Sequence, residues 1–216
     1  MSIFSNLSYK SRKKKLEIFY DLVSPDKNTK VLDVGAEVDF SGKRGLQLID
    51  GYQWRSSLTA VNLSDQHCAK ISEKYPEMTV QVGDACNLPF PDKSFDIIYS
   101  NAVIEHVGDF EAQKKMAEEI MRVGKSWYIT TPNRWYPFEF HLRLPFITWL
   151  PFHGYKIFRK LICYNHAKRR YGFGSDTSNL QLMSASDLRK CFPESEIIKP
   201  RVTFMAETLV AYGKSE

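Results

Sequence analysis

Five short apolar runs recur between residues 30 and 133, and each run closes on a glycine or a small polar residue. Such a run is typical of a strand buried on both faces of a sheet. Helix-like stretches separate the runs, and this alternation predicts a mostly parallel sheet covered by helices on both faces. The runs are KVLDVG (30–35), SLTAVNLS (57–64), MTVQVGDA (78–85), SFDIIYSN (94–101) and SWYITTPN (126–133).

The helices and the C-terminal strands complete the predicted doubly wound α/β fold. Ser64 is a capping residue at the start of one helix, and Gly124 ends another. After the last helix, 196–204 and 207–214 look like two strands joined by a tight turn, which permits only an antiparallel pair. The predicted helices span 16–23, 64–75, 110–124 and 184–192.

Residues 134–183 break the alternation of strands and helices. They are rich in aromatic, proline and basic residues. A chain of 216 residues suits one substantial domain, so we predict a single domain over 1–216 with an aromatic, basic lid inserted at about 134–183. Within the lid, 154–170 has apolar residues at helical spacing between basic residues, which predicts an amphipathic helix.

The net charge of +5 is unevenly distributed. Segments 1–15 and 140–175 hold twelve basic residues and no acidic ones, and the rest of the chain holds 18 basic and 25 acidic residues. This asymmetry indicates an acidic partner for the basic segments, such as a phosphate, a nucleic acid or an anionic membrane. We expect a cytoplasmic protein. A peripheral membrane contact through 154–170 is a further alternative. The sequence assigns no function to the basic N-terminus.

Polar residues stand where the predicted strands end. Ligands of open parallel sheets bind outside the carboxyl ends of the strands. Side chains from different strands should therefore gather at one edge, as a nucleoside-bearing cofactor requires. The residues at these ends include Asp33, Gly35, Asn62, Asp84, Asn101 and Asn133.

The same segments resemble the class I S-adenosylmethionine-dependent methyltransferases, in particular the methyltransferase type 11 group. VLDVG is similar to their first motif, and LTAVNLS to the motif of the second strand. The most specific match is GDACNLPFPDKSFDIIYSNAVIEHV (83–107). The resemblance covers about 30–133 and the C-terminal hairpin, and it implies a Rossmann-like fold, S-adenosyl-L-methionine as cofactor and methyl transfer as activity.

The resemblance also implies a role for each cofactor-site residue. Asp33 and Gly35 would meet the methionine end, with Asn101 lining the pocket beside it. Asn62 would meet the ribose, Asp84 and the backbone of Ala85 the adenine, and Leu63 and Leu88 would sandwich the ring.

Two departures from the family pattern leave an alternative open. The glycine loop continues as GAEVDFSGKRG (35–45), without the usual further glycines, and Asn62 replaces the usual acidic residue. A non-catalytic cofactor-binding or interaction protein is therefore the second hypothesis. The same loop does not match the glycine pattern of nicotinamide dehydrogenases or of P-loop nucleotidases.

On the acceptor side, His106 and His141 are the candidate general bases for a hydroxyl acceptor. Glu139 and His141 lack a third ligand, so no metal site is expected. The segment from 132 to 151 resembles family members associated with polysaccharide or lipid-linked sugar synthesis. It implies a small-molecule, glycan or lipid-linked acceptor, methylated on oxygen, that contacts Asn133, Arg134, Tyr136 and Glu139. An RNA methyltransferase is the third hypothesis.

Overall fold

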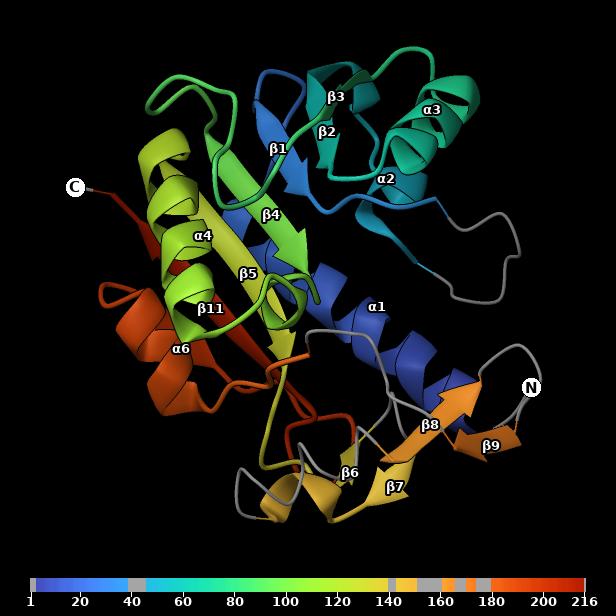
Figure 1. Cartoon of the computed structure of the whole chain (residues 1–216). Coiled ribbons are helices and arrows are strands. Elements are labelled where there is room, and N and C mark those ends of the chain that lie inside the picture. The colour runs from blue at the N-terminus through green and yellow to red at the C-terminus, as the bar shows by residue number, and fades with distance from the viewer. Residues whose placement is uncertain are drawn as a thin grey trace.

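The computed structural model describes residues 3–38, 46–139, 143–150, 161–165, 170–173 and 180–215. A seven-stranded sheet, with strand order β10-β11-β5-β4-β1-β2-β3, forms its centre (Figure 1). The sheet strands are β1 (Val31–Val34), β2 (Leu58–Asn62), β3 (Thr79–Val82), β4 (Ile97–Asn101), β5 (Ser126–Pro132), β10 (Glu196–Ile198) and β11 (Thr208–Lys214). The main helices are α1 (Ile3–Val23), α2 (Leu48–Gly51), α3 (Asp65–Lys74), α4 (Phe110–Val123) and α6 (Ala185–Cys191).

The sheet is parallel except at its C-terminal strands, as the sequence predicts. β1 pairs in parallel with β2 and β4, while β11 runs antiparallel to both β5 and β10. The predicted tight turn before β11 is wrong. β10 ends at Ile198, and residues 199–207 form a loop in which the Asn133 Nδ2 group donates to the Ala206 carbonyl at 2.9 Å. Pro200, which has no N–H to donate, interrupts the strand that was expected to reach residue 204.

Each face of the sheet packs on its own helices, because successive strand residues point to opposite sides. Leu32 belongs to the cluster that buries α4 and α6. Its neighbour Val31 belongs to the cluster that buries α1, α2 and α3. The two layers of helices are separated by the sheet in Figure 1. The carboxyl ends of the parallel strands are left as the edge at which a ligand can approach.

Helix α1 is much longer than the predicted helix over 16–23. It begins at Ile3 and includes the basic cluster, because no glycine or proline interrupts residues 3–23. Phe19 fixes it to the sheet through edge-to-face contacts with Tyr99 and Tyr128, at centroid distances of 5.2 and 5.4 Å. The basic N-terminus is therefore part of the folded domain.

The insertion after β5 contains two small antiparallel pairs. β6 (Phe138–Glu139) pairs with β7 (Leu144–Pro145), and β8 (Ile162–Asn165) pairs with β9 (Arg170–Phe173). The prediction of one helix over 154–170 is wrong where the chain is described, because 162–165 is a strand. Tyr164 and Tyr171 face each other across this ladder, as aromatic pairs of strands do. Residues 154–160 lie outside the described part.

Among the helices of the described residues, none combines the length and the apolar character that crossing a bilayer requires.

Candidate functional site

Asp33 is buried in the middle of the sheet edge. It lies in β1 between Ala60 of β2 and Tyr99 of β4, with 5% of its surface exposed. Burial raises the pKa of this carboxyl to about 8, because water no longer stabilises the charged form. The Asp33 carboxyl is therefore mostly protonated below about pH 8.

Gly35 turns the chain at the end of β1. Its φ is +81°, a conformation that favours glycine, and its N–H donates to the Val61 carbonyl at 2.8 Å. A Cβ at this position would lie 2.3 Å from Cγ2 of Val103. The missing side chain thus lets the loop after β4 close onto the loop after β1.

Asn62 joins the loops after β1 and β2. Its Nδ2 group donates to the Ala36 carbonyl at 2.9 Å, and its Oδ1 accepts from the Ser64 N–H at 2.8 Å. The Asn62 amide thereby orders the edge next to Leu63. Ser64 then caps α3, as predicted, by accepting from the His67 N–H at 3.4 Å.

Leu63 and Leu88 lie in opposite environments. Leu63 is 75% exposed at the edge, whereas Leu88 is 3% exposed and belongs to the core under α4. The prediction that Leu88 contacts the adenine is therefore wrong, because the core already covers the Leu88 side chain. Leu63 is an apolar side chain at the polar edge with its surface open to a ligand.

Asp84 begins the loop after β3. Its side chain is exposed, and its Oδ1 accepts from the Cys86 N–H at 2.9 Å while its carbonyl accepts from the Asn87 N–H. Ala85 follows, half-buried against the core. The carboxylate thus fixes the local turn that presents Ala85.

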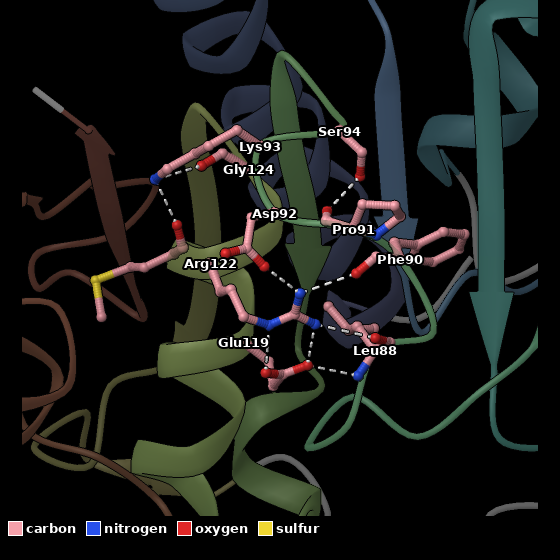
Figure 2. Close-up of polar contacts among 10 residues, drawn as sticks. Leu88, Phe90, Pro91, Asp92, Lys93, Ser94, Glu119, Arg122 and Gly124 are labelled. Carbon is pink, nitrogen blue, oxygen red and sulfur yellow. Dashed lines mark hydrogen bonds and ion pairs between the residues drawn. The ribbon is translucent and has the colours of Figure 1, made fainter.

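Arg122 of α4 holds the continuation of this loop (Figure 2). Its guanidinium donates to the carbonyls of Leu88 and Phe90, at 3.1 and 2.9 Å. It also pairs with the carboxylates of Asp92 and Glu119, each at 2.7 Å. Five N–H donors in a rigid fork suit arginine to this task. The sequence gives no signal that Arg122 would reach this loop, since the contacts span about thirty positions.

Lys15 of α1 reaches the carboxyl ends of the strands from the face of the sheet opposite α4. The sequence analysis did not identify it as a site residue. It is 7% exposed, and its Nζ donates to Oδ1 of Asn101 at 2.7 Å. The hydroxyl of Thr130 donates to the same oxygen at 2.8 Å. Burial and the nearby Arg12 lower the pKa of Lys15 to about 8, while Glu105 and Glu207 act in the opposite direction. A basic run looks solvent-exposed in sequence, so the pattern held no sign of this burial.

The structure places Glu105 inside the protein and His106 at its surface. Glu105 is fully buried and its Oε2 accepts from the Thr131 hydroxyl at 2.9 Å, whereas His106 is exposed. Both lie in the short 3₁₀ turn Ile104–His106. His141 falls outside the described residues.

A small pocket lies beyond the end of β5, where the sequence predicts the acceptor. Asn133, Tyr136 and the buried carboxylates of Glu139 and Glu207 are among its lining residues. Within the described residues, Oε1 of Glu207 has no hydrogen-bond partner. A buried acceptor of this kind favours a ligand group that donates a hydrogen bond.

The three predicted acceptor residues other than Glu139 have structural contacts in or near this pocket. The side-chain oxygen of Asn133 accepts from the Trp135 N–H at 3.1 Å, and the hydroxyl of Tyr136 lies 3.1 Å from that of Thr203. Arg134 is directed over the Trp135 ring at 5.6 Å. These contacts leave Glu139 and Glu207 as the charged groups of the pocket wall.

Comparison with known sequences matches residues 39–126 to the family model described as a methyltransferase domain. A probable S-adenosylmethionine-dependent methyltransferase of Mycolicibacterium smegmatis is 32% identical over 66 residues, which are 31% of this chain and 26% of that protein. A similarly named protein of Mycobacterium tuberculosis is 29% identical over 75 residues, which are 35% of this chain and 27% of that protein. The chain thus spans about a quarter of the length of these curated relatives.

Solved structures match over nearly the whole chain. The PH0226 protein of Pyrococcus horikoshii OT3 has a TM-score of 0.61 at 18% identity, covering 96% of this chain and 91% of that one. A possible histamine N-methyltransferase of Thermotoga maritima has a TM-score of 0.59 at 16% identity, covering 98% and 91%. At these identities the likeness concerns the fold. Residues 39–126 are thus similar to the methyltransferase domain family, and the chain has the fold of the class I methyltransferases.

Proposed function

We propose that the protein binds S-adenosyl-L-methionine at the carboxyl edge of the sheet and transfers its methyl group to an acceptor. The observation that carries this proposal is the position of the matched residues 39–126 in the fold. They supply β2, β3 and β4, whose ends carry Leu63, Asp84 and Asn101. The local structure fits such a ligand, because an apolar side chain stands exposed among polar groups.

The proposed cofactor residues divide by chemistry. Asp33, Gly35 and Asn101 would hold the methionine end, and Asp84 and Ala85 the adenine, with Leu63 against the ring. Asn62 would reach the ribose through the second lone pair of Oδ1, since the first is occupied by the Ser64 N–H. When bound, S-adenosyl-L-methionine supplies an electrophilic methyl group on its sulfonium.

On the acceptor side, we place Lys15 as the general base for a hydroxyl acceptor. Its pKa of about 8 leaves a neutral fraction near physiological pH. Its Nζ lies at the end of β4, bonded to Asn101. A neutral Nζ can take the proton that the hydroxyl loses as its oxygen attacks the methyl group. We propose a small-molecule, glycan or lipid-linked hydroxyl acceptor, supported by the Glu139 and Glu207 carboxylates that can accept further hydroxyl protons in hydrogen bonds.

The test follows a labelled methyl group. The protein is incubated with methyl-labelled S-adenosyl-L-methionine and a heat-treated cell extract, which is then separated into polar small molecules, lipids and RNA. Label in the small-molecule or lipid fraction is expected, and the proposed acceptor class is wrong if label enters only RNA.

Lys15→Met provides the sharper comparison, with Lys14→Met as its matched control. Lys14 lies in the same helix with 49% of its side chain exposed. We expect Lys15→Met to lower kcat by about 10²-fold or more and Lys14→Met to leave it unchanged. The rate of the wild-type protein should rise with pH and level off above about 8. Equal kcat values for Lys15→Met and wild type would exclude the role of this base.

A non-catalytic cofactor-binding protein is the second candidate. It is favoured by the Asn62 amide, whose two ends already bond to the protein backbone, and by the loop 35–45, which lacks the family's further glycines. Binding of cofactor without label in any fraction would support this candidate over the enzyme.

A further inference from the structure

Large hydrophobic side chains are exposed mainly on the insertion. Within the described residues eleven are exposed, and seven of these fall between positions 135 and 173. A gathering of this kind on a polar protein surface marks a contact site. The seven are Trp135, Phe146, Trp149, Leu150, Leu161, Tyr171 and Phe173.

Three of these residues form one ordered cluster. Trp149 donates its indole N–H to the Trp135 carbonyl at 3.0 Å, and its ring packs edge-to-face on Phe146 with centroids 4.9 Å apart. Phe146 has a φ of +56°, which a bulky residue rarely adopts. The chain thus holds Phe146 in an unfavourable backbone conformation while 55% of its surface stays exposed.

Arg143 connects this cluster to the hairpin of β8 and β9. Its guanidinium donates to the Tyr164 hydroxyl at 3.0 Å, and its carbonyl accepts from the Tyr171 hydroxyl at 2.9 Å. Phe173 extends from the hairpin with 98% of its surface exposed. Figure 1 shows the two hairpins at one end of the molecule, beyond the carboxyl ends of β4 and β5.

The charge of the segment complements an anionic surface. Residues 140–175 hold seven basic side chains and no acidic one. Aromatic rings with arginine and lysine are the residues found at the boundary between lipid headgroups and acyl chains. Leu150 and Leu161 offer aliphatic surface, which lipid chains can cover but which cannot stack on nucleobases. A second copy of the chain would carry the same excess of basic residues in this segment.

We propose that the insertion docks on an anionic phospholipid membrane through Trp135, Phe146 and Trp149 together with the β8–β9 hairpin. Thr148, between two members of the cluster, also lines the acceptor pocket. Docking therefore brings the pocket to the lipid surface. The contact does not depend on methyl transfer, and it can be measured without cofactor or acceptor.

The test is co-sedimentation of the full chain with vesicles. One set contains equimolar phosphatidylcholine and phosphatidylglycerol, and the other contains phosphatidylcholine alone. We expect binding to the anionic set, weakening as salt is raised, with a blue shift of tryptophan fluorescence as Trp135 and Trp149 leave water. The double variant Phe146→Ser/Trp149→Ser should bind about tenfold or more weakly.

Val82→Ser is the matched control, since Val82 is an exposed apolar residue on β3, at the far edge of the sheet. It should bind vesicles like the wild type, and circular dichroism must show the same fold for all variants. Equal affinity for both vesicle sets, or unchanged binding of the double variant, overturns the proposal. The proposal is also overturned if sedimentation velocity shows a dimer of the wild-type chain that the double variant no longer forms, because the aromatic surface would then be the dimer interface.

Discussion

At the scale of single residues, two buried titratable groups approach the carboxyl edge of the sheet from different elements. Burial raises the pKa of Asp33 to about 8 and, with Arg12, lowers the pKa of Lys15 to about 8. Near neutral pH, Asp33 is therefore mostly protonated, while Lys15 is mostly charged with a neutral fraction. Both can exchange protons in the pH range in which a cell works.

Asp33→Asn should change how stability depends on pH. The folded protein keeps the Asp33 proton from about pH 4 to about pH 8, whereas the unfolded chain, whose Asp pKa is near 3.8, does not. The contribution of Asp33 to the free energy of unfolding therefore falls as pH rises through this window. Urea unfolding of both proteins at pH 5, 7 and 8.5 measures it. The stability of wild type relative to the variant should decline with pH, and a constant difference would contradict the assignment.

Gly35→Ala should destabilise the protein and its cofactor site. The new Cβ meets Val103 in a backbone conformation with positive φ, and overpacking of this kind costs roughly 1–3 kcal/mol. Gly51→Ala is the control, because nothing lies within 4 Å of a Cβ there. It should be neutral or stabilising by up to about 1 kcal/mol, since Gly51 ends helix α2. Similar melting temperatures for both variants would refute the packing argument.

At the scale of elements, helix α4 constrains the loop after β3. Arg122 and Glu119 of α4 bind its backbone, and the Lys93 N–H donates to the Arg122 carbonyl at 2.9 Å. These hydrogen bonds from α4 hold the backbone of the loop that begins at Asp84 in place. Helix α4 thus holds the loop in which we propose the adenine site.

Arg122→Ala should therefore weaken the binding of S-adenosyl-L-methionine more than it lowers kcat. It leaves the carbonyls of Leu88 and Phe90 without their guanidinium partner, at a cost of about 1–3 kcal/mol in stability. Lys114→Ala, which removes an exposed ion pair with Glu111 on the same helix, should cost less than about 0.5 kcal/mol. Calorimetric titration and urea unfolding compare the two. Equal cofactor affinity in both variants would show that the clamp does not position the site.

The elements were predictable from sequence where local signals decide them. Each of the five apolar runs contains a strand, and Ser64 starts a helix and Gly124 ends another as predicted. The failures come from long-range contacts. Lys15 bonds to a residue 86 positions away, and Arg122 to carbonyls more than thirty away. Leu88 is buried by such contacts as well, although a loop leucine and an exposed ligand contact look alike in sequence.

At the scale of the whole molecule, the two basic segments, 1–15 and 140–175, belong to different parts of the protein. Lys15 brings one charge of the N-terminal cluster into the ligand edge, so part of that cluster belongs to the site. The basic residues of 140–175 instead belong, in sequence, to the insertion that carries the exposed aromatic side chains. In the proposed function, the cofactor therefore binds around β1 to β4, and the acceptor binds near β5, the insertion and the start of β11.

The binding of S-adenosyl-L-methionine tests the central claim most directly. Isothermal titration of the wild-type chain with this cofactor, and with its demethylated product, should give saturable binding at one site per chain. Gly35→Ala should lose most of this affinity, while Gly51→Ala should keep it. The absence of binding to the wild-type protein at millimolar cofactor would contradict the proposed methyltransferase function.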